Sequence, residues 1–165
     1  MPTSKTPLRV VLAGDHAGFP LKSFIAEWLS EGSSDRPVEL TLKDCGAYDE
    51  TPSDYPTFAI AVAAEIVAGR ADKGILVCGS GVGVSVAANK VAGIRAAVCH
   101  DSYTAHQGVE HDDMNVLCVG GRVIGPELAK EVIKAFLKAE YTPKERHARR
   151  LEAVLKLERE GLPTS

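Results

Sequence analysis

The sequence predicts an α/β fold in three layers, with a doubly wound, five-stranded parallel sheet between two layers of helices. Short β-branched apolar runs alternate with segments that have helical apolar spacing, and strands that alternate with helices pair in parallel. In the middle of the chain, the apolar run Ile75–Val77 leads through Cys78 into three alternating glycines and an alanine-rich segment. This pattern is typical of a buried strand that turns sharply into a helix N-terminus, with backbone amides available to a ligand.

The strands are expected where apolar runs stop at a glycine, an aspartate or a cysteine. The second of these runs predicts a weaker strand than the others, because polar residues interrupt it. The strands are expected at residues 8–13, 38–43, 73–78, 94–99 and 115–119.

The helices begin at recognisable start signals. Asp54 precedes one helix, Asp101 or Ser102 caps another, and Gly125-Pro126 places a proline at a first helical position. The segment His111–Met114 is expected to form a loop before the last strand. The helices are expected at residues 19–29, 58–67, after the glycine turn, at 101–109 and at 126–137.

A final helix is expected over about residues 143–160, after the alternating elements are complete. Thr142 to Glu145 reads as a capping box with a proline just inside it, and the helix that follows is basic and amphipathic. Its apolar residues, among them Leu151 and Leu155, have no remaining sheet face to cover. A helix appended to a finished sheet often packs on a partner chain, which favours a homodimer.

Composition limits the class of protein. The 165 residues are predicted to form one domain, 1–165, with its core at about residues 8–140, and the hydrophobic and charged fractions of 45% and 25% are ordinary for a globular chain. A net charge of −3 argues against a nucleic-acid surface. No apolar run is long enough to span a membrane, and Met1–Lys5 lacks the apolar segment of a signal peptide. Four cysteines without a CxxC pair indicate reduced thiols and a cytoplasmic location.

Polar side chains gather where the predicted strands end, which is where open α/β sheets bind ligands. A thiol beside a helix N-terminus has its thiolate stabilised by backbone amides, and a neighbouring hydroxyl can hold or pass a proton. Each residue also has a plainer interpretation, since an aspartate can cap a helix and a cysteine can simply fill a core. The candidates at these positions are Asp15, His16, Cys78, Ser80, His111 and Arg122.

Two phosphate-binding interpretations compete. Arg146 and Arg150 share one face of the last helix and, with Arg122, suit a dianionic phosphate, although such a run is usually a solvated basic face. Alternatively, the glycine turn binds a nucleotide, with Asp101 in the place of a ribose-binding acid. The glycines are spaced GxGxG rather than GxGxxG, and the pattern GxxxxGK[ST] is absent. A nucleotide-binding module is therefore the alternative hypothesis.

A series of short segments, taken together and in order, matches one known family. They are Gly14-Asp15-His16-Ala17-Gly18, Asp54-Tyr55-Pro56, Cys78-Gly79-Ser80-Gly81-Val82-Gly83, Ala87-Ala88-Asn89-Lys90, Gly93-Ile94-Arg95, Asn115-Val116-Leu117 and Gly120-Gly121-Arg122-Val123. Over about residues 8 to 157 the chain resembles the type B ribose-5-phosphate isomerases, which include the galactose-6-phosphate isomerase subunits. The resemblance implies a Rossmann-like homodimer that interconverts an aldose phosphate and a ketose phosphate through a cis-enediolate, without a metal or other cofactor.

The resemblance also implies a role for each site residue. Cys78 is the base that moves a proton between C1 and C2, Ser80 assists proton movement between the oxygens, and His111 helps to open the furanose ring. The glycine-turn amides face the developing oxyanion. His111, Arg122, Arg146 and Arg150 are expected to come from the neighbouring subunit. The implied substrate-binding residues are Asp15, His16, Gly79, Gly81, Gly83, Asp112, Arg122, Arg146 and Arg150.

Two positions bear on the base and on the substrate. A second branch of the family has a glutamate base where this chain has Val84, which leaves Cys78 as the base. The family usually has an asparagine where this chain has Asp112, and an ionised carboxylate near an enediolate would repel it. Ribose 5-phosphate with ribulose 5-phosphate is the expected substrate pair, and another four- to six-carbon sugar phosphate is the alternative.

Overall fold

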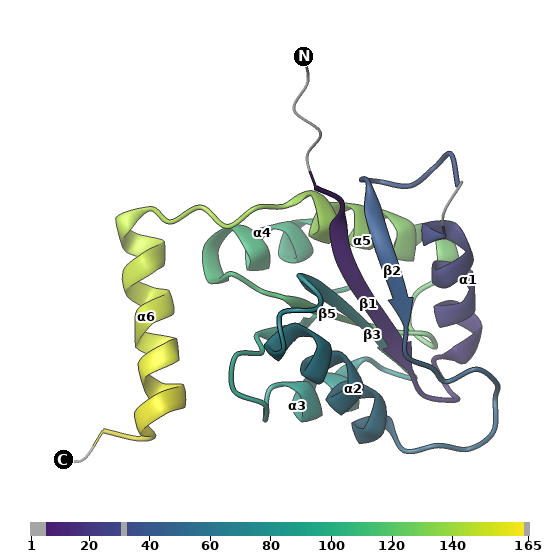
Figure 1. The fold of residues 1–165 in the computed structure, drawn as a ribbon, viewed down its shortest axis with the longest axis horizontal. Coiled ribbons are helices and arrows are strands. Elements are labelled where there is room, and N and C mark those ends of the chain that lie inside the picture. Colours follow the sequence, from purple (N-terminus) through teal and green to yellow (C-terminus); the bar gives the residue numbers. More distant parts are fainter. Residues whose placement is uncertain (1–5, 31–32, 164–165) are drawn as a thin grey trace.

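The centre of the molecule is a five-stranded, all-parallel sheet in the order β2-β1-β3-β5-β4 (Figure 1). The computed structural model describes residues 6–30 and 33–163; Met1–Lys5 and Glu31, which begins an expected polar loop, lie outside these ranges. The prediction of a doubly wound parallel sheet is confirmed. The strands are β1 (Leu8–Gly14), β2 (Leu40–Asp44), β3 (Lys73–Cys78), β4 (Ala96–Val98) and β5 (Val116–Gly120).

Helices cover both faces of the sheet and form two separate apolar cores. Buried residues of α1, α4 and α5 pack on one face, and buried residues of α2 and α3 pack on the other. Helix α6 belongs to neither core and stands beside the sheet at the end of an extended connection (Figure 1). The helices are α1 (Phe19–Leu29), α2 (Tyr55–Val67), α3 (Val82–Ala88), α4 (Ser102–Asp112), α5 (Pro126–Lys138) and α6 (Glu145–Glu160).

The end of α4 and the start of α6 differ from those expected. Helix α4 continues to Asp112, so His111 lies in its last turn rather than in a loop. The helix ends at Asp113, whose φ of 50° is left-handed; aspartate tolerates this conformation better than most residues, and no glycine announces the end. The expected capping box before α6 is also wrong, because Lys144 is the N-cap residue and makes no side-chain capping hydrogen bond.

Alternation along β3 decides which way the cysteine faces. Ile75 and Val77 belong to the core under α1, α4 and α5, whereas Leu76 and Cys78 belong to the core under α2 and α3. The parallel register pairs Gly14 with Val77 and Cys78 with Gly120. The segments that follow β1, β3 and β5 therefore emerge at one edge of the sheet. The strand order reverses between β1 and β3, where doubly wound sheets form their ligand crevices.

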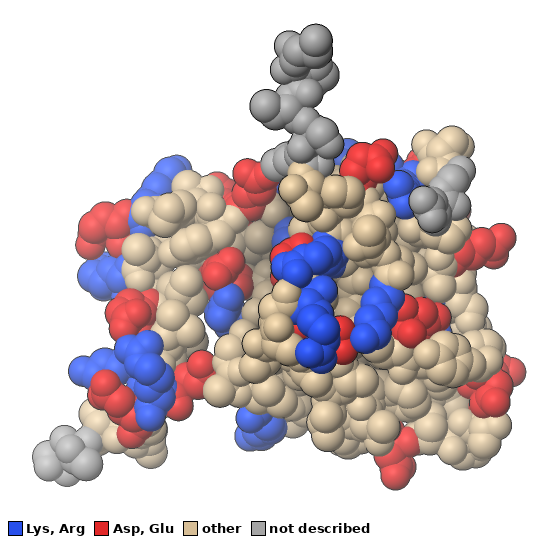
Figure 2. All heavy atoms as spheres, viewed as in Figure 1, with Lys and Arg blue, Asp and Glu red and all other residues tan. Residues whose placement is uncertain are grey.

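Charges of both signs are mixed over the surface that Figure 2 shows, without a continuous basic field. Near the amino ends of β1 and β3, Arg9 pairs with Asp72. On α2, Glu65 accepts from Arg70 at 3.0 Å and pairs with Lys43 at 2.9 Å. No helix within the described ranges is long and apolar enough to cross a membrane.

The Glu65 ion pairs predict a pH-dependent stability. Hydrogen bonds from Arg70 and Lys43 lower the pKa of Glu65 from 4.5 to about 2. Because the folded-state pKa is depressed, the stabilisation is complete above the unfolded-state pKa and disappears as the pH falls from about 4.5 to about 2. Glu65→Gln is expected to flatten the dependence of the urea midpoint on pH in this window. Glu127→Gln, which changes an exposed carboxylate, is the control, and equal slopes for wild type and Glu65→Gln would contradict the prediction.

Candidate active site

A pocket of about 510 Å³ opens at the carboxyl edge of β1, β3 and β5. The strand register accounts for its position, because three strand ends and the start of α2 meet there. Cys78 is 5% exposed and lies at the floor of this pocket. The pocket is lined by Asp15, His16, Ala17, Tyr55, Cys78, Gly79, Ser80, Gly83, Arg122 and Val123.

The glycine turn presents a backbone amide to the thiol. The Gly81 N–H donates to Cys78 Sγ at 3.1 Å, and the Val82 N–H donates to Ser80 Oγ at 3.2 Å. Gly81 has a φ of 81°, a left-handed conformation that glycine adopts without strain, and this conformation starts α3. The Gly81 amide is thus directed at the sulfur of Cys78.

The end of β1 supplies two polar groups to the pocket. Asp15 is 7% exposed, and its Oδ1 accepts from the Gly18 N–H at 2.9 Å. The backbone of Ser53 holds the ring of His16: Nδ1 lies 3.1 Å from the Ser53 nitrogen and 3.2 Å from the Ser53 oxygen. In either tautomer Nδ1 has a partner, so Nε2 is the ring nitrogen left for a ligand.

The loop that carries Ser53 begins at an ion pair between a buried lysine and a partly exposed aspartate. Lys22 is 1% exposed, and its Nζ donates to both carboxylate oxygens of Asp44 at 2.7 Å and to the carbonyl of Ala47 at 2.6 Å. A buried ammonium with three such partners fixes the position of the chain that holds them. The pair joins α1 to the end of β2 and so positions the segment leading to the pocket.

Two residues that shape the pocket, Ser53 and Tyr55, are not among the site residues expected from the sequence. The Tyr55 ring packs over Gly83 so closely that a Cβ added at Gly83 would lie 3.1 Å from it. Tyr55 could have been found from the sequence, because it lies in Asp54-Tyr55-Pro56, one of the segments that carry the family resemblance. For Ser53 no signal was available, because its role depends on a contact with a residue 37 positions away.

Arg122 lies in the same pocket as Cys78 within one chain. Its backbone N–H donates to the Gly79 carbonyl at 3.0 Å, and a Cβ added at Gly79 would lie 3.5 Å from its Nη1. The family resemblance implies that this arginine comes from a neighbouring subunit. The short connection after β5 instead brings it to the glycine turn of its own chain.

The other predicted residues form a second group, between α4 and α6. The rings of His111 and His147 stack with centroids 4.0 Å apart, and Arg146 Nε donates to His147 Nε2 at 3.1 Å. Arg150 is exposed one turn further along α6, and Asp112 is exposed on α4. None of these residues lines the Cys78 pocket of the same chain.

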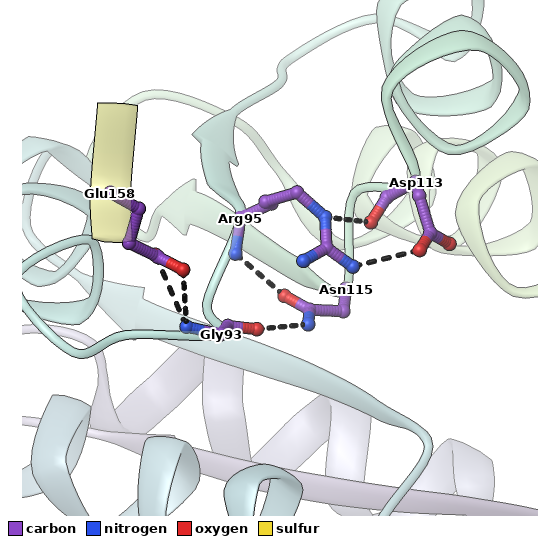
Figure 3. Close-up of polar contacts among 5 residues, drawn as sticks. All are labelled: Gly93, Arg95, Asp113, Asn115 and Glu158. Carbon is purple, nitrogen blue, oxygen red and sulfur yellow. Dashed lines mark hydrogen bonds and ion pairs between the residues drawn. The ribbon is translucent and has the colours of Figure 1, made fainter. Parts of the chain in front are cut away.

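Helix α6 is also attached near its other end (Figure 3). The carboxylate of Glu158 accepts from the Gly93 N–H at 3.1 Å, and the side chain of Asn115 donates to the Gly93 carbonyl at 2.8 Å. Arg95 completes the network through Asp113. Between the two attachments lies a cavity of about 470 Å³, whose α6 wall is made of Leu151, Val154, Leu155, Leu157 and Glu158.

Other features bear on alternative ligands. A larger cavity of about 740 Å³ lies at the amino edge of the sheet, where Lys73 Nζ donates to the carbonyls of Phe136 and Ala139 at 2.7 Å each. This lysine therefore fixes the end of α5.

Asp101, the acid considered for a ribose, uses its carboxylate to cap α4 through the Thr104 N–H at 2.8 Å. Within the described part of the chain, no group of three or more His, Cys, Asp or Glu side chains is placed to hold a metal ion.

The chain resembles known proteins along most of its length. Residues 10–154 match the family model described as Ribose/Galactose Isomerase. Ribose-5-phosphate isomerase B of Escherichia coli is 45% identical over 150 residues, which are 91% of this chain and 96% of the relative. D-erythrulose-4-phosphate isomerase 2 of Mycolicibacterium smegmatis is 39% identical over 147 residues, 89% of this chain and 95% of the relative. The structure of ribose-5-phosphate isomerase B from Mycoplasma genitalium with bound ribulose-5-phosphate superposes with a TM-score of 0.82 at 36% identity, covering 93% of this chain and 97% of that one.

The amide contact predicts that Cys78 is more reactive than the two other buried thiols, Cys99 and Cys118. Burial raises the pKa of Cys99 and of Cys118, whereas the sulfur of Cys78 accepts a hydrogen bond from the Gly81 N–H at 3.1 Å. Iodoacetamide is expected to label Cys78 about tenfold faster than Cys99, because the thiolate is the reacting species. Peptide mass spectrometry after timed quenching gives the two rates. Cys99, at 4% exposure, is a matched control for Cys78 at 5%, and equal rates would refute the prediction.

Proposed function

The chain belongs to the ribose/galactose isomerase family and is a sugar-phosphate isomerase, and from this premise we propose that it interconverts ribose 5-phosphate and ribulose 5-phosphate. The observation that carries the proposal is the thiol of Cys78 at the floor of the pocket, with the Gly81 N–H 3.1 Å from its sulfur. A thiolate there can take a proton from a bound sugar and return it to the adjacent carbon.

In the proposed mechanism the proton moves within one substrate molecule. The Cys78 thiolate removes the proton from C2 of the open-chain aldose, and the electron pair of that C–H bond forms the C1–C2 double bond of a cis-enediolate. The resulting thiol returns the proton to C1. Ser80, whose hydroxyl lies at the mouth of the same turn, transfers a proton from the C2 oxygen to the C1 oxygen. Atoms and charge balance without an added reactant.

The phosphate is proposed to bind between basic groups of two chains. His16 and Arg122 line the Cys78 pocket of one chain, whereas Arg146 and Arg150 lie on α6 outside that pocket. A second copy of the chain would supply its own α6 arginines, and its His111, to the pocket of the first. The exposed side chains of Val154 and Leu157 on α6, at 55% and 51%, support an apolar contact between copies. We therefore infer a homodimer with two shared sites.

A tetrose phosphate is the second candidate substrate. A relative 39% identical to this chain bears the name D-erythrulose-4-phosphate isomerase 2. Asp112, adjacent to His111, also places a carboxylate where the family usually has an amide. The chemistry at C1 and C2 is the same for both sugars, so Cys78 keeps its role in either case.

A substrate panel tests both the base and the sugar. Among tetrose, pentose and hexose phosphates, kcat/KM is expected to be highest for ribose 5-phosphate. Cys78→Ala should lower kcat by roughly 10²- to 10⁴-fold, the range for loss of a general base, with KM little changed. Cys45→Ala is the matched control and should retain turnover. A preference for the tetrose would replace the proposed substrate, and normal turnover by Cys78→Ala would overturn the base assignment.

Mixing two inactive variants tests whether the site is shared. Cys78→Ala disables the pocket side, and His111→Ala disables the α4 side. If each site takes one side from each chain, a mixed dimer contains one intact site and one doubly altered site. Co-refolding equal amounts should restore about a quarter of wild-type activity, since half of the dimers are mixed and each has one working site. No recovery would show that both residues act within one chain.

A further inference from the structure

We propose that His147 is a positioning residue that holds the ring of His111 and the guanidinium of Arg146 in one arrangement, and that this arrangement matters for substrates that bind as closed rings. The proposal rests on the proposed function for the roles of His111 and Arg146. His147 itself is 1% exposed. Its hydrogen bonds and its ring contact are with Thr142, Arg146 and His111, and none of these residues lines the Cys78 pocket of the same chain.

The hydrogen bonds of His147 determine its tautomer. Its Nδ1 lies 2.9 Å from the carbonyl oxygen of Thr142, and because a carbonyl only accepts, Nδ1 carries the proton. Its Nε2 lies 3.1 Å from Arg146 Nε, and because a guanidinium only donates, Nε2 is the acceptor. Both nitrogens are therefore used. A histidine with both nitrogens engaged and almost no exposed surface has one orientation.

The ring of His147 in turn supports His111. The two rings stack with centroids 4.0 Å apart and an interplanar angle of 28°. His111 lies in the last turn of α4 and His147 in the first turn of α6, so the stack joins two helices whose own backbones do not hydrogen-bond to each other. The stack restricts the plane of His111 at the position where a ring-opening group needs a fixed orientation.

The connection between the helices closes this arrangement. The Thr142 N–H donates to the carbonyl of Glu110 at 3.0 Å, one residue before His111. The Thr142 carbonyl accepts from the Lys144 N–H at 2.8 Å as well as from His147. A path of contacts thus runs from α4 through Thr142 to His147 and back to α4 through the ring stack. Loss of His147 would release His111 and Arg146 together.

Sugar chemistry separates positioning from a merely structural role. Ribose 5-phosphate exists as a furanose, formed when its C4 oxygen attacks C1, and must be opened before isomerisation. Ribulose 5-phosphate cannot form the corresponding five-membered ring, because its C5 oxygen carries the phosphate. Exchange of the C1 hydrogens of ribulose 5-phosphate with solvent reports enediolate formation without ring opening. A structural defect lowers both activities alike, whereas a misplaced His111 lowers only the conversion that passes through the ring.

Two substitutions divide the contacts of His147 between them. His147→Asn can keep the hydrogen bond to Thr142 but removes the ring from under His111. His147→Phe keeps an aromatic ring under His111 but removes the acceptor for Arg146 and the hydrogen bond to Thr142. His106→Asn is the matched control, because His106 lies on the same helix as His111 and its side chain is 51% exposed. The measurements are isomerisation of saturating ribose 5-phosphate, exchange into ribulose 5-phosphate in D₂O, and inhibition by inorganic phosphate.

The two variants are expected to fail in different ways. His147→Asn should lower isomerisation about tenfold more than exchange, since the ring-opening group is displaced while the base is not. His147→Phe should leave the ratio of isomerisation to exchange near the wild-type value. It should weaken inhibition by inorganic phosphate about fivefold, since an arginine without its supporting acceptor binds phosphate less well. His106→Asn should match wild type in all three measurements.

Circular dichroism defines a temperature at which each protein is folded, and the assays are made there. An unchanged ratio for His147→Asn would overturn the proposal, and so would loss of fold in both variants without a selective effect. If the wild-type protein isomerises no sugar phosphate, the proposed function fails instead. The inhibition arm is then replaced by calorimetric titration with inorganic phosphate, which still compares His147→Phe with wild type.

Discussion

The parallel pairing of β3 between β1 and β5 is the constraint on which the rest of the molecule depends. It buries β3 on both faces, so its sequence is apolar up to the cysteine, and it makes three connections leave the sheet at one edge. Gly14 and Gly18 lie so close to the carbonyl of Val77 that a Cβ added at either position would collide with its oxygen. The close approach of the segments that follow β1, β3 and β5 places Asp15 and Arg122 in the same pocket as the Cys78 thiol. A wider spacing would separate the polar groups that the pocket needs together.

Local patterns were enough to predict most of the fold. Strand β3 and helix α1 have the expected bounds, because apolar periodicity reflects burial directly. The carboxyl-edge position of Cys78 follows from the same pattern, since a strand that leads into a glycine turn can end at only one edge of a parallel sheet. The end of α4 was missed because Asp113 closes the helix in a left-handed conformation that resembles no glycine signal.

What could not be predicted depends on contacts between distant segments. The hydrogen bonds between Ser53 and His16 join residues 37 positions apart, and the local sequence around either residue does not predict them. The position of Arg122 was misjudged because the resemblance supplied a role without a geometry within one chain. The N-cap of α6 is Lys144 and not the expected capping box. The extended segment before the helix is held by backbone hydrogen bonds of Thr142, and no side chain caps the helix. These are tertiary effects that override local preference.

The separation of α6 from both apolar cores has a consequence for the order of events in the cell. The sheet and its five covering helices acquire their packing within a single chain, so the Cys78 pocket forms at a rate independent of protein concentration. If α6 completes the pocket of a second copy, as proposed, the finished site obeys the law of mass action instead. Folding would then be independent of protein concentration, whereas catalytic activity would depend on it. A newly synthesised chain would reach its native fold before it dimerises and becomes active.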